Sequence, residues 1–235
     1  MKIMITGATS GIGKALTIRY AKQGHDVIAC GRNADKLQTL VAEYPTIETL
    51  CFDLTDYHHY PILAQQIDLL ILNAGDCLYI NDPLHFDAQA FEQTINLNLI
   101  SIGYCLQAWL KNMNKGGRLV LVSSSAGLLP LPRAEGYGAS KAALTYLAKT
   151  LSLTLKPHHI SVSVVQPGFI DTPLTERNNF AMPMMITSQS AAQQIIQGIH
   201  KGKTEINVPF AFVLMMKVFR FLPDFIWRYL AVRMT

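Results

Sequence analysis

The chain has 235 residues, half of them apolar, and a formal net charge of +4 at pH 7. This size suits one globular domain that buries a full core without disulfides or a structural metal. The four cysteines have no Cys-x-x-Cys spacing and no histidine pair beside them, so we expect no metal site. We interpret all four as buried thiols of a reducing compartment.

The first segment is apolar, but it reaches Thr6-Gly7 after five residues and is too short for the apolar region of a signal sequence. We therefore expect a cytoplasmic protein. The first 200 residues carry 14 basic and 14 acidic side chains, whereas residues 201–235 carry six basic and two acidic ones. The whole net charge thus lies in the last segment.

Short β-rich runs alternate with helical stretches, and no repeat or low-complexity linker interrupts them. Strands are expected at Lys2–Thr6, Asp26–Cys30, Thr46–Phe52, Leu69–Leu72, Arg118–Ser123, Ser161–Gln166 and Glu205–Val208. Helices are expected near Gly13–Gln23, Ala34–Glu43, Asp87–Met113, Tyr137–Leu155 and Ser188–His200. This alternation predicts an α/β fold: one Rossmann-type doubly wound parallel sheet of about seven strands over residues 1–208, and an apolar helical extension over 209–235.

A glycine-rich loop joins the first strand to the first helix. Gly7 permits a tight turn, Gly11 lets the backbone approach a pyrophosphate, and Gly13 allows close packing of helix on strand. The helix N-terminus adds N–H donors for phosphate charge. The loop predicts a dinucleotide site made by Gly7, Thr9, Ser10, Gly11, Ile12 and Gly13. A purely structural turn is the alternative.

The end of the second strand indicates the form of the cofactor. An acidic residue there would bind the ribose 2′-hydroxyl of NAD, but this chain has Gly31-Arg32. A guanidinium can hold a 2′-phosphate with two hydrogen bonds, so Arg32 favours NADP(H) over NAD(H). The alternative is that Arg32 is only solvated.

Tyr137 and Lys141 lie one helical turn apart on the same face of the predicted helix Tyr137–Leu155. A free phenol has a pKa of about 10 and is a weak acid or base at neutral pH. A nearby ammonium group favours the phenolate, so we expect Lys141 to lower the pKa of Tyr137 into a useful range.

These motifs together resemble the short-chain dehydrogenase/reductase family across roughly residues 1–210. The resemblance rests on six features in the family's order: the glycine loop, Asp53-Leu54, Asn73-Ala74-Gly75, Ser124, Tyr137-x-x-x-Lys141 and Pro167-Gly168. Ser124 ends the preceding strand thirteen residues before Tyr137.

The resemblance implies the catalytic roles. Tyr137 would give a proton to the substrate oxygen in reduction and accept it in oxidation. Lys141 would lower the pKa of Tyr137 and bind the nicotinamide ribose, while Ser124 would polarise the substrate carbonyl.

The resemblance also implies most of the residues that contact the cofactor. Tyr137 and Lys141 are among them. Asp53 and Leu54 would flank the adenine, and the segment after the sixth strand would position the nicotinamide. These further contacts are Asp53, Leu54, Asn73, Ala74, Gly75, Pro167, Gly168, Ile170 and Thr172.

Relatives also use an Asn of the central helix, whose carbonyl holds a water of the proton relay. Asn96 and Asn98 compete for this role. Only Asn98 has a small residue three positions later, Ser101, and the apolar-Gln-Ala-apolar-Leu run of the family after it. We therefore assign the role to Asn98, with a merely structural Asn as the alternative.

The connection between Asp53 and Asn73 is shorter than in most relatives. We expect a helix of two or three turns there, beginning near His58-His59. We interpret these histidines, and His158-His159, as solvated loop groups, because no set of acidic partners accompanies them.

The segment Pro173–Thr187 corresponds to the family's mobile lid and contains Leu174, Phe180, Met182, Met184 and Met185. Adaptable thioether side chains suit an apolar, tolerant substrate pocket. The alternative is that they simply pack the lid.

From Phe210 onward the chain is rich in apolar and aromatic residues mixed with basic ones. The run is too short and too charged to span a membrane, but it suits a helical hairpin lying on anionic lipid. The alternatives are a cover for the core or a subunit interface.

We thus expect an NADP(H)-dependent oxidoreductase that interconverts a carbonyl and an alcohol on a small or apolar substrate by hydride transfer. The alternatives are an epimerase or dehydratase using the same site, or a non-catalytic nucleotide sensor. We expect no nucleic-acid partner, assembly as a homodimer or homotetramer as the family implies, and peripheral membrane contact only through residues 210–235.

Overall fold

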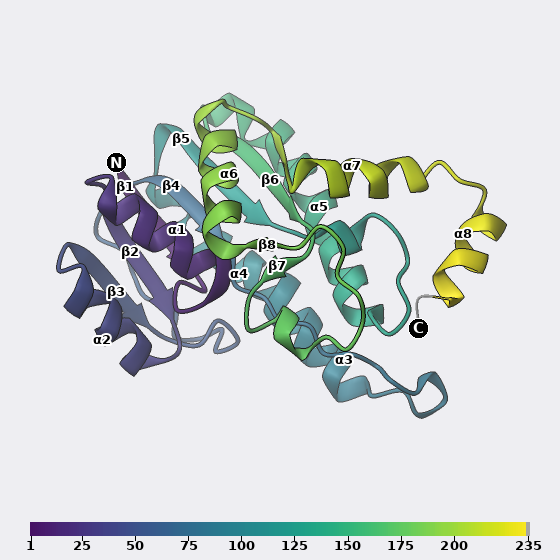
Figure 1. The fold of residues 1–235 in the computed structure, drawn as a ribbon. Helices are drawn as coiled ribbons and strands as arrows, with labels where there is room; N and C mark the ends of the chain where they lie inside the picture. Colours follow the sequence, from purple (N-terminus) through teal and green to yellow (C-terminus); the bar gives the residue numbers. More distant parts are fainter. Residues whose placement is uncertain (234–235) are drawn as a thin grey trace.

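The computed structural model describes residues 1–233. Its main sheet has seven parallel strands in the order β3-β2-β1-β4-β5-β6-β9 (Figure 1). These strands are β1 (Lys2–Thr6), β2 (Asp26–Gly31), β3 (Ile47–Cys51), β4 (Ile67–Leu72), β5 (Met113–Val122), β6 (Ser161–Pro167) and β9 (Glu205–Val208). The predicted doubly wound Rossmann-type sheet is confirmed.

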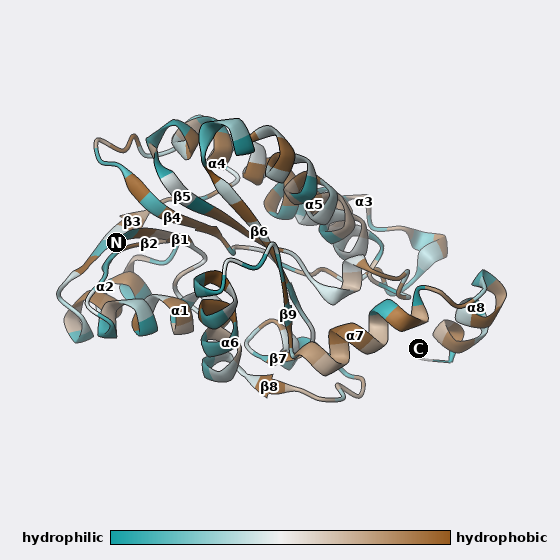
Figure 2. Ribbon diagram, turned by 90° about the horizontal axis from the view of Figure 1, so that it is seen from above, coloured by the Kyte–Doolittle hydropathy of each residue, from teal (hydrophilic) through white to brown (hydrophobic). Residues whose placement is uncertain are grey.

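Eight α-helices of the described chain flank or extend this sheet. They are α1 (Gly11–Lys22), α2 (Ala34–Glu43), α3 (Ala88–Ile95), α4 (Ser101–Trp109), α5 (Glu135–Thr154), α6 (Ser188–His200), α7 (Phe210–Phe219) and α8 (Asp224–Val232). Figure 2 shows α1, α2 and α6 on one face of the sheet and α4 and α5 on the other. The strands are apolar on both sides because both faces are covered.

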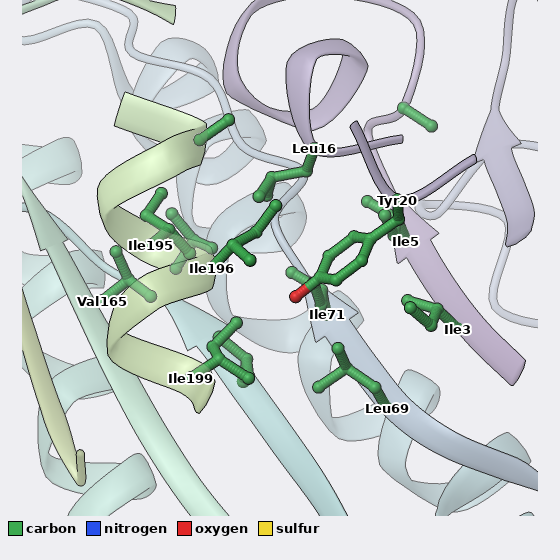
Figure 3. Close-up of a cluster of buried hydrophobic side chains, with 14 of the residues drawn as sticks. Ile3, Ile5, Leu16, Tyr20, Leu69, Ile71, Val165, Ile195, Ile196 and Ile199 are labelled. Atoms are coloured by element: carbon green, nitrogen blue, oxygen red, sulfur yellow. The ribbon is translucent and has the colours of Figure 1, made fainter. Parts of the chain in front are cut away.

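Each face of the sheet has its own hydrophobic core. Beneath α1 and α6, Tyr20 lies fully buried, and Figure 3 shows its ring among Ile71, Ile196 and Ile199. The phenol oxygen has no hydrogen-bond partner, and burial raises the pKa of Tyr20 above its ordinary value. The opposite core centres on Trp109, which is also fully buried.

The strand order places β1 and β4 side by side, although β2 and β3 follow β1 in the chain. At this point the connections leave in opposite directions, and a crevice opens at the carboxyl ends of the strands. The glycine loop follows β1 and Asn73 follows β4, so both stand at this crevice.

The helix predicted between Asp53 and Asn73 does not form. Asp53 Oδ1 instead accepts hydrogen bonds from the amide and hydroxyl of Thr55, and Tyr60 donates to the carbonyl of Leu54. Such local side-chain bonds compete with helix formation, and Pro61 cannot supply a helical N–H. Its carbonyl instead accepts from Trp109 Nε1, so the segment runs as a loop fixed to α4.

The single helix predicted over Asp87–Met113 is also wrong in detail. A π-helical turn, Asn96–Ile100, separates α3 from α4, and β5 begins at Met113 rather than at Arg118. The β5 strand passes through Gly116, which has a φ of +86°, and its pairing with β4 shifts register there. The pair Gly116-Gly117 therefore produces an irregularity inside the β5 strand.

A two-stranded sheet of β7 (Ile170–Asp171) and β8 (Ile186–Thr187) closes the base of the segment between them. This segment, residues 172–185, contains most of the predicted lid Pro173–Thr187, whose last two residues form β8. Its only regular turn is the 3₁₀ helix Thr175–Arg177 within the described chain.

The C-terminal extension is helical, as predicted. Figures 1 and 2 show α7 leading away from the sheet and α8 beyond its far end. Of the helices in residues 1–233, none is long and apolar enough to cross a membrane. The two helices pack one face onto Leu129 and its neighbours, which confirms in part the alternative that they cover the core.

Candidate active site

A cavity of about 500 Å³ opens at the carboxyl ends of the strands. It brings together predicted residues from seven separate segments of the chain. These are Gly7, Thr9, Ser10, Gly11, Ile12, Arg32, Asp53, Leu54, Asn73, Ala74, Gly75, Ser124, Tyr137, Lys141, Pro167, Gly168, Ile170 and Thr172. Two predicted residues, Gly13 and Asn98, lie behind its wall instead.

The glycine loop has the geometry that a phosphate cradle needs. Gly7 and Gly11 have φ values of +66° and +50°, in the left-handed region. A Cβ on Gly13 would lie 2.1 Å from the carbonyl oxygen of Gly7, so this residue serves close packing. The N-cap of α1, Ser10, makes no side-chain cap, and no acidic residue occupies the first turn. The first N–H groups thus remain available to an anion.

Asn73 fixes the end of β4 to this loop. Its Nδ2 donates to the carbonyl of Thr6 at 3.1 Å, and the hydroxyl of Thr6 accepts from the amides of Asn73 and Ala74. Thr6 is buried, so these bonds are shielded from water. The two strands at the crevice therefore hold one fixed geometry.

At the far end of the cavity, Arg32 and Asp53 face one another. The closest nitrogen–oxygen distance is 4.0 Å, and the two side chains are 74% and 43% exposed. Hydrogen bonds from Thr55 are the main cause that lowers the pKa of Asp53, and the charge of Arg32 adds to them. A pair this exposed is weak, so the guanidinium is free to bind another anion.

The catalytic candidates meet where β5 and α5 converge. Ser124 follows β5, while Tyr137 and Lys141 lie on the first two turns of α5. The Nζ of Lys141 lies 5.7 Å from the centre of the Tyr137 ring and donates to the carbonyl of Val122 at 3.1 Å. A Cβ on Gly75 would come within 3.1 Å of this Nζ, so only glycine leaves room there.

Burial controls the titration of both groups. It raises the pKa of Tyr137 to about 12, against the opposite influence of the Ser124 hydroxyl. It also lowers the pKa of Lys141 to about 8. Contrary to our expectation, the pKa of Tyr137 is thus raised rather than lowered, because desolvation of the buried phenol is the largest influence on it. Tyr137 is therefore protonated at neutral pH and can act as a proton donor.

Asn98 lies fully buried in the π-helical turn behind Gly75. Its Oδ1 accepts from the amide of Asp76 at 2.9 Å, and its Nδ2 donates to the carbonyl of Asp76 and to Ser140 Oγ. It therefore joins the segment after β4 to α5. Asn96 is engaged elsewhere, since its carbonyl accepts from the hydroxyl of Tyr57.

Among the lining residues that the sequence analysis did not predict are two charged ones, Asp76 and Arg177. Asp76, directly after Asn73-Ala74-Gly75, forms an ion pair with Arg177 of the lid. Hydrogen bonds also fix the next two lid residues. Asn178 accepts one from the Tyr79 hydroxyl, and Asn179 accepts one from Arg133. The run of three polar residues, 177–179, was the available signal.

The methionines of the lid do not line the cavity, which Leu174 and Thr175 reach instead. Met184 and Met185 are about half exposed, at 53% and 47%. Phe180 is the aromatic residue that packs inward, in edge contact with Tyr79 and Phe169. Methionine content alone was thus a poor guide to the pocket.

The fold is a Rossmann-type α/β fold, and its cavity is lined by a tyrosine and a lysine among other residues. The chain matches the family described as short chain dehydrogenase over residues 1–183. It is also 30% identical to an uncharacterized oxidoreductase of Myxococcus xanthus (strain DK1622) over 237 residues, covering 94% of this chain and 92% of that protein. The chain belongs to the short-chain dehydrogenase/reductase family.

Solved structures agree with this assignment. A short-chain dehydrogenase from Sphingobium yanoikuyae in complex with NADPH is 26% identical, with a TM-score of 0.79 over 89% of this chain and 88% of that one. A short chain dehydrogenase/reductase from Burkholderia phymatum in complex with NAD is 20% identical, with a TM-score of 0.80 over 92% and 91%. The second likeness shows the fold alone.

Proposed function

We propose that this protein is an NADP(H)-dependent oxidoreductase that interconverts a carbonyl and an alcohol. The observation that carries the proposal is the convergence of Ser124, Tyr137 and Lys141 on the cavity that the glycine loop also lines. A nucleotide sensor would have no need for a buried phenol and ammonium at this point.

The residues present fit a dinucleotide. The glycine loop leaves space that a side chain would fill, since a Cβ on Gly11 would lie 2.9 Å from Thr172. The uncapped N-terminus of α1 suits the pyrophosphate, and Arg32 suits a 2′-phosphate dianion. The nicotinamide, when bound, supplies hydride to the carbonyl carbon.

The chain's own groups perform the proton chemistry. Ser124 donates a hydrogen bond to the carbonyl oxygen and so polarises it, and Tyr137 transfers its phenolic proton to that oxygen as negative charge develops. Lys141, buried and adjacent, stabilises the resulting phenolate and binds the nicotinamide ribose. Asn98 holds Asp76 and α5 in place, and its backbone carbonyl would bind the water through which the proton is relayed.

We further propose an apolar substrate. Leu174 lines the cavity, and behind it Phe180 of the lid packs between Tyr79 and Phe169. An apolar wall recognises shape and tolerates variation, so several ketones or aldehydes of similar size should be accepted.

The test is a panel of ketones and aldehydes with NADPH as reductant, followed through nicotinamide absorbance. We expect cofactor oxidation with apolar members of the panel. Substrate conversion without net cofactor oxidation would indicate an epimerase or dehydratase, and NADPH binding without any turnover would indicate a sensor.

Cofactor choice is tested separately by fluorescence titration. We expect NADPH to bind more tightly than NADH, and Arg32→Asp to abolish or reverse this preference because it replaces the cation by an anion. Lys36→Asp, an exposed substitution on α2, is the matched control and should keep the preference. Equal affinities of the unmodified protein for the two cofactors would contradict the assignment.

A further inference from the structure

The C-terminal helices carry a line of large apolar side chains on their outer face. We call these residues the C-terminal stripe: Phe210, Leu214, Val218, Phe221, Phe225, Tyr229 and Val232. Within each helix they recur at intervals of three or four residues, the spacing of one helix face, and Phe221 lies in the connection between α7 and α8. Their exposed fractions run from 46% to 88%, so the stripe is open to solvent along its length.

The stripe cannot turn inward, because the opposite face of the same helices is already packed. Phe212, Val213 and Met216 of α7, with Trp227 and Ala231 of α8, are buried around Leu129. Trp227 Nε1 also donates to the carbonyl of Pro130 at 3.0 Å. Figure 2 shows the α7 ribbon mostly in the colour of hydrophobic residues and the α8 ribbon in mixed colours. An exposed apolar surface held this firmly marks an interaction site.

The charges beside the stripe are basic. Residues 209–235 contain four cations, Lys217, Arg220, Arg228 and Arg233, and one anion, Asp224, a net charge of +3. Lys217 pairs with Glu205 and Arg228 with Asp224. Within residues 1–233, no acidic side chain pairs with Arg220 or Arg233, and Arg233 instead lies over the Tyr229 ring.

We propose that the C-terminal stripe docks the protein on an anionic lipid surface, with α7 and α8 lying in the headgroup region. Apolar side chains would enter the acyl boundary while the arginines meet lipid phosphates, which is how interfacial helices bind. A second copy of the chain fits less well, since a two-fold contact would bring two basic surfaces together.

Vesicle sedimentation of the full chain tests this proposal. The protein should sediment with vesicles containing phosphatidylglycerol at low salt, be released as salt rises, and stay in solution with pure phosphatidylcholine. The double substitution Phe221→Glu with Phe225→Glu should weaken binding by about tenfold or more, because it removes apolar anchors and adds negative charge.

Ile62→Glu is the matched control. Ile62 is 94% exposed but lies in the loop between β3 and β4, away from the stripe, so this variant should bind like the unmodified protein. Both variants should keep the thermal unfolding midpoint of the unmodified chain, since they alter exposed positions. Equal loss of binding in both would overturn the proposal.

Tryptophan fluorescence tests directly whether the C-terminal stripe inserts into the lipid bilayer. Trp109 and Trp227 are both buried, so a tryptophan introduced by Phe221→Trp would dominate any quenching by brominated lipid. We expect quenching on anionic vesicles. No quenching, or a change from dimer to monomer in Phe221→Glu with Phe225→Glu by sedimentation velocity, would overturn the proposal. The second result would assign the stripe to a subunit contact.

Discussion

The ring of Phe212 in α7 lies directly against Gly168, where a Cβ would come within 2.4 Å of Phe212 Cδ1. The amide of Gly168 also donates to the carbonyl of Val208, the last residue of β9. The C-terminal helix therefore supports the turn that follows β6, and that turn lines the cavity. The first residues beyond the sheet thus take part in shaping the site.

Phe212→Ala should lower the free energy of unfolding by about 3–5 kcal/mol, because it removes a buried aromatic ring and leaves a cavity. Phe212 is 4% exposed, whereas Phe210 is 60% exposed. Phe210→Ala is therefore the control, with a change of about 0.5 kcal/mol or less. Urea unfolding measures both. If the two variants lose the same stability, α7 does not support the core.

Arg177→Met should loosen the lid by removing its ion pair with Asp76. Global stability should fall by only about 0–1 kcal/mol, since both side chains are partly exposed. Hydrogen exchange of residues 172–185 should accelerate, because local opening depends on local contacts. Residues 188–200 in α6 provide the internal control and should exchange as before. Unchanged exchange in the lid would mean that the ion pair does not hold it.

The four cysteines should react very unequally with a thiol reagent. Cys30, Cys77 and Cys105 are buried as expected, but Cys51 is exposed, so the expectation that all four thiols are buried is wrong for Cys51. Burial also raises the pKa of Cys77 to about 11 and that of Cys105 to about 12, so little reactive thiolate exists at neutral pH.

Ellman's reagent should therefore modify one thiol quickly in the native protein and four after unfolding in guanidinium. Cys51→Ser should remove the fast reaction. A fast reaction that persists in Cys51→Ser would show that one of the other three sites opens readily.

The sequence predicted the sheet well, because strands buried on both faces appear as short apolar runs. Lys2–Thr6 and Glu205–Val208 match β1 and β9 at both ends. The residues that line the cavity were also predictable, since the carboxyl ends of parallel strands must meet at one edge.

What failed depended on contacts between distant segments. The side chains of Trp109 and Asn112 donate hydrogen bonds to carbonyls of the loop before β4. The sequence of that loop alone does not predict these contacts. The ion pair of Asp76 and Arg177 joins residues about a hundred positions apart. The pKa of Tyr137 depends on how deeply the tertiary fold buries the ring, which residue spacing alone does not determine.

The most direct test of the proposed chemistry is Tyr137→Phe, assayed for turnover and for NADPH binding in parallel. The account predicts a loss of about 10²–10⁴-fold in turnover, because a positioned acid contributes that much, with cofactor affinity nearly unchanged. Tyr146→Phe, on the same helix but 76% exposed, should retain full activity. Activity above a few per cent in Tyr137→Phe would show that another group supplies the proton and would contradict the account.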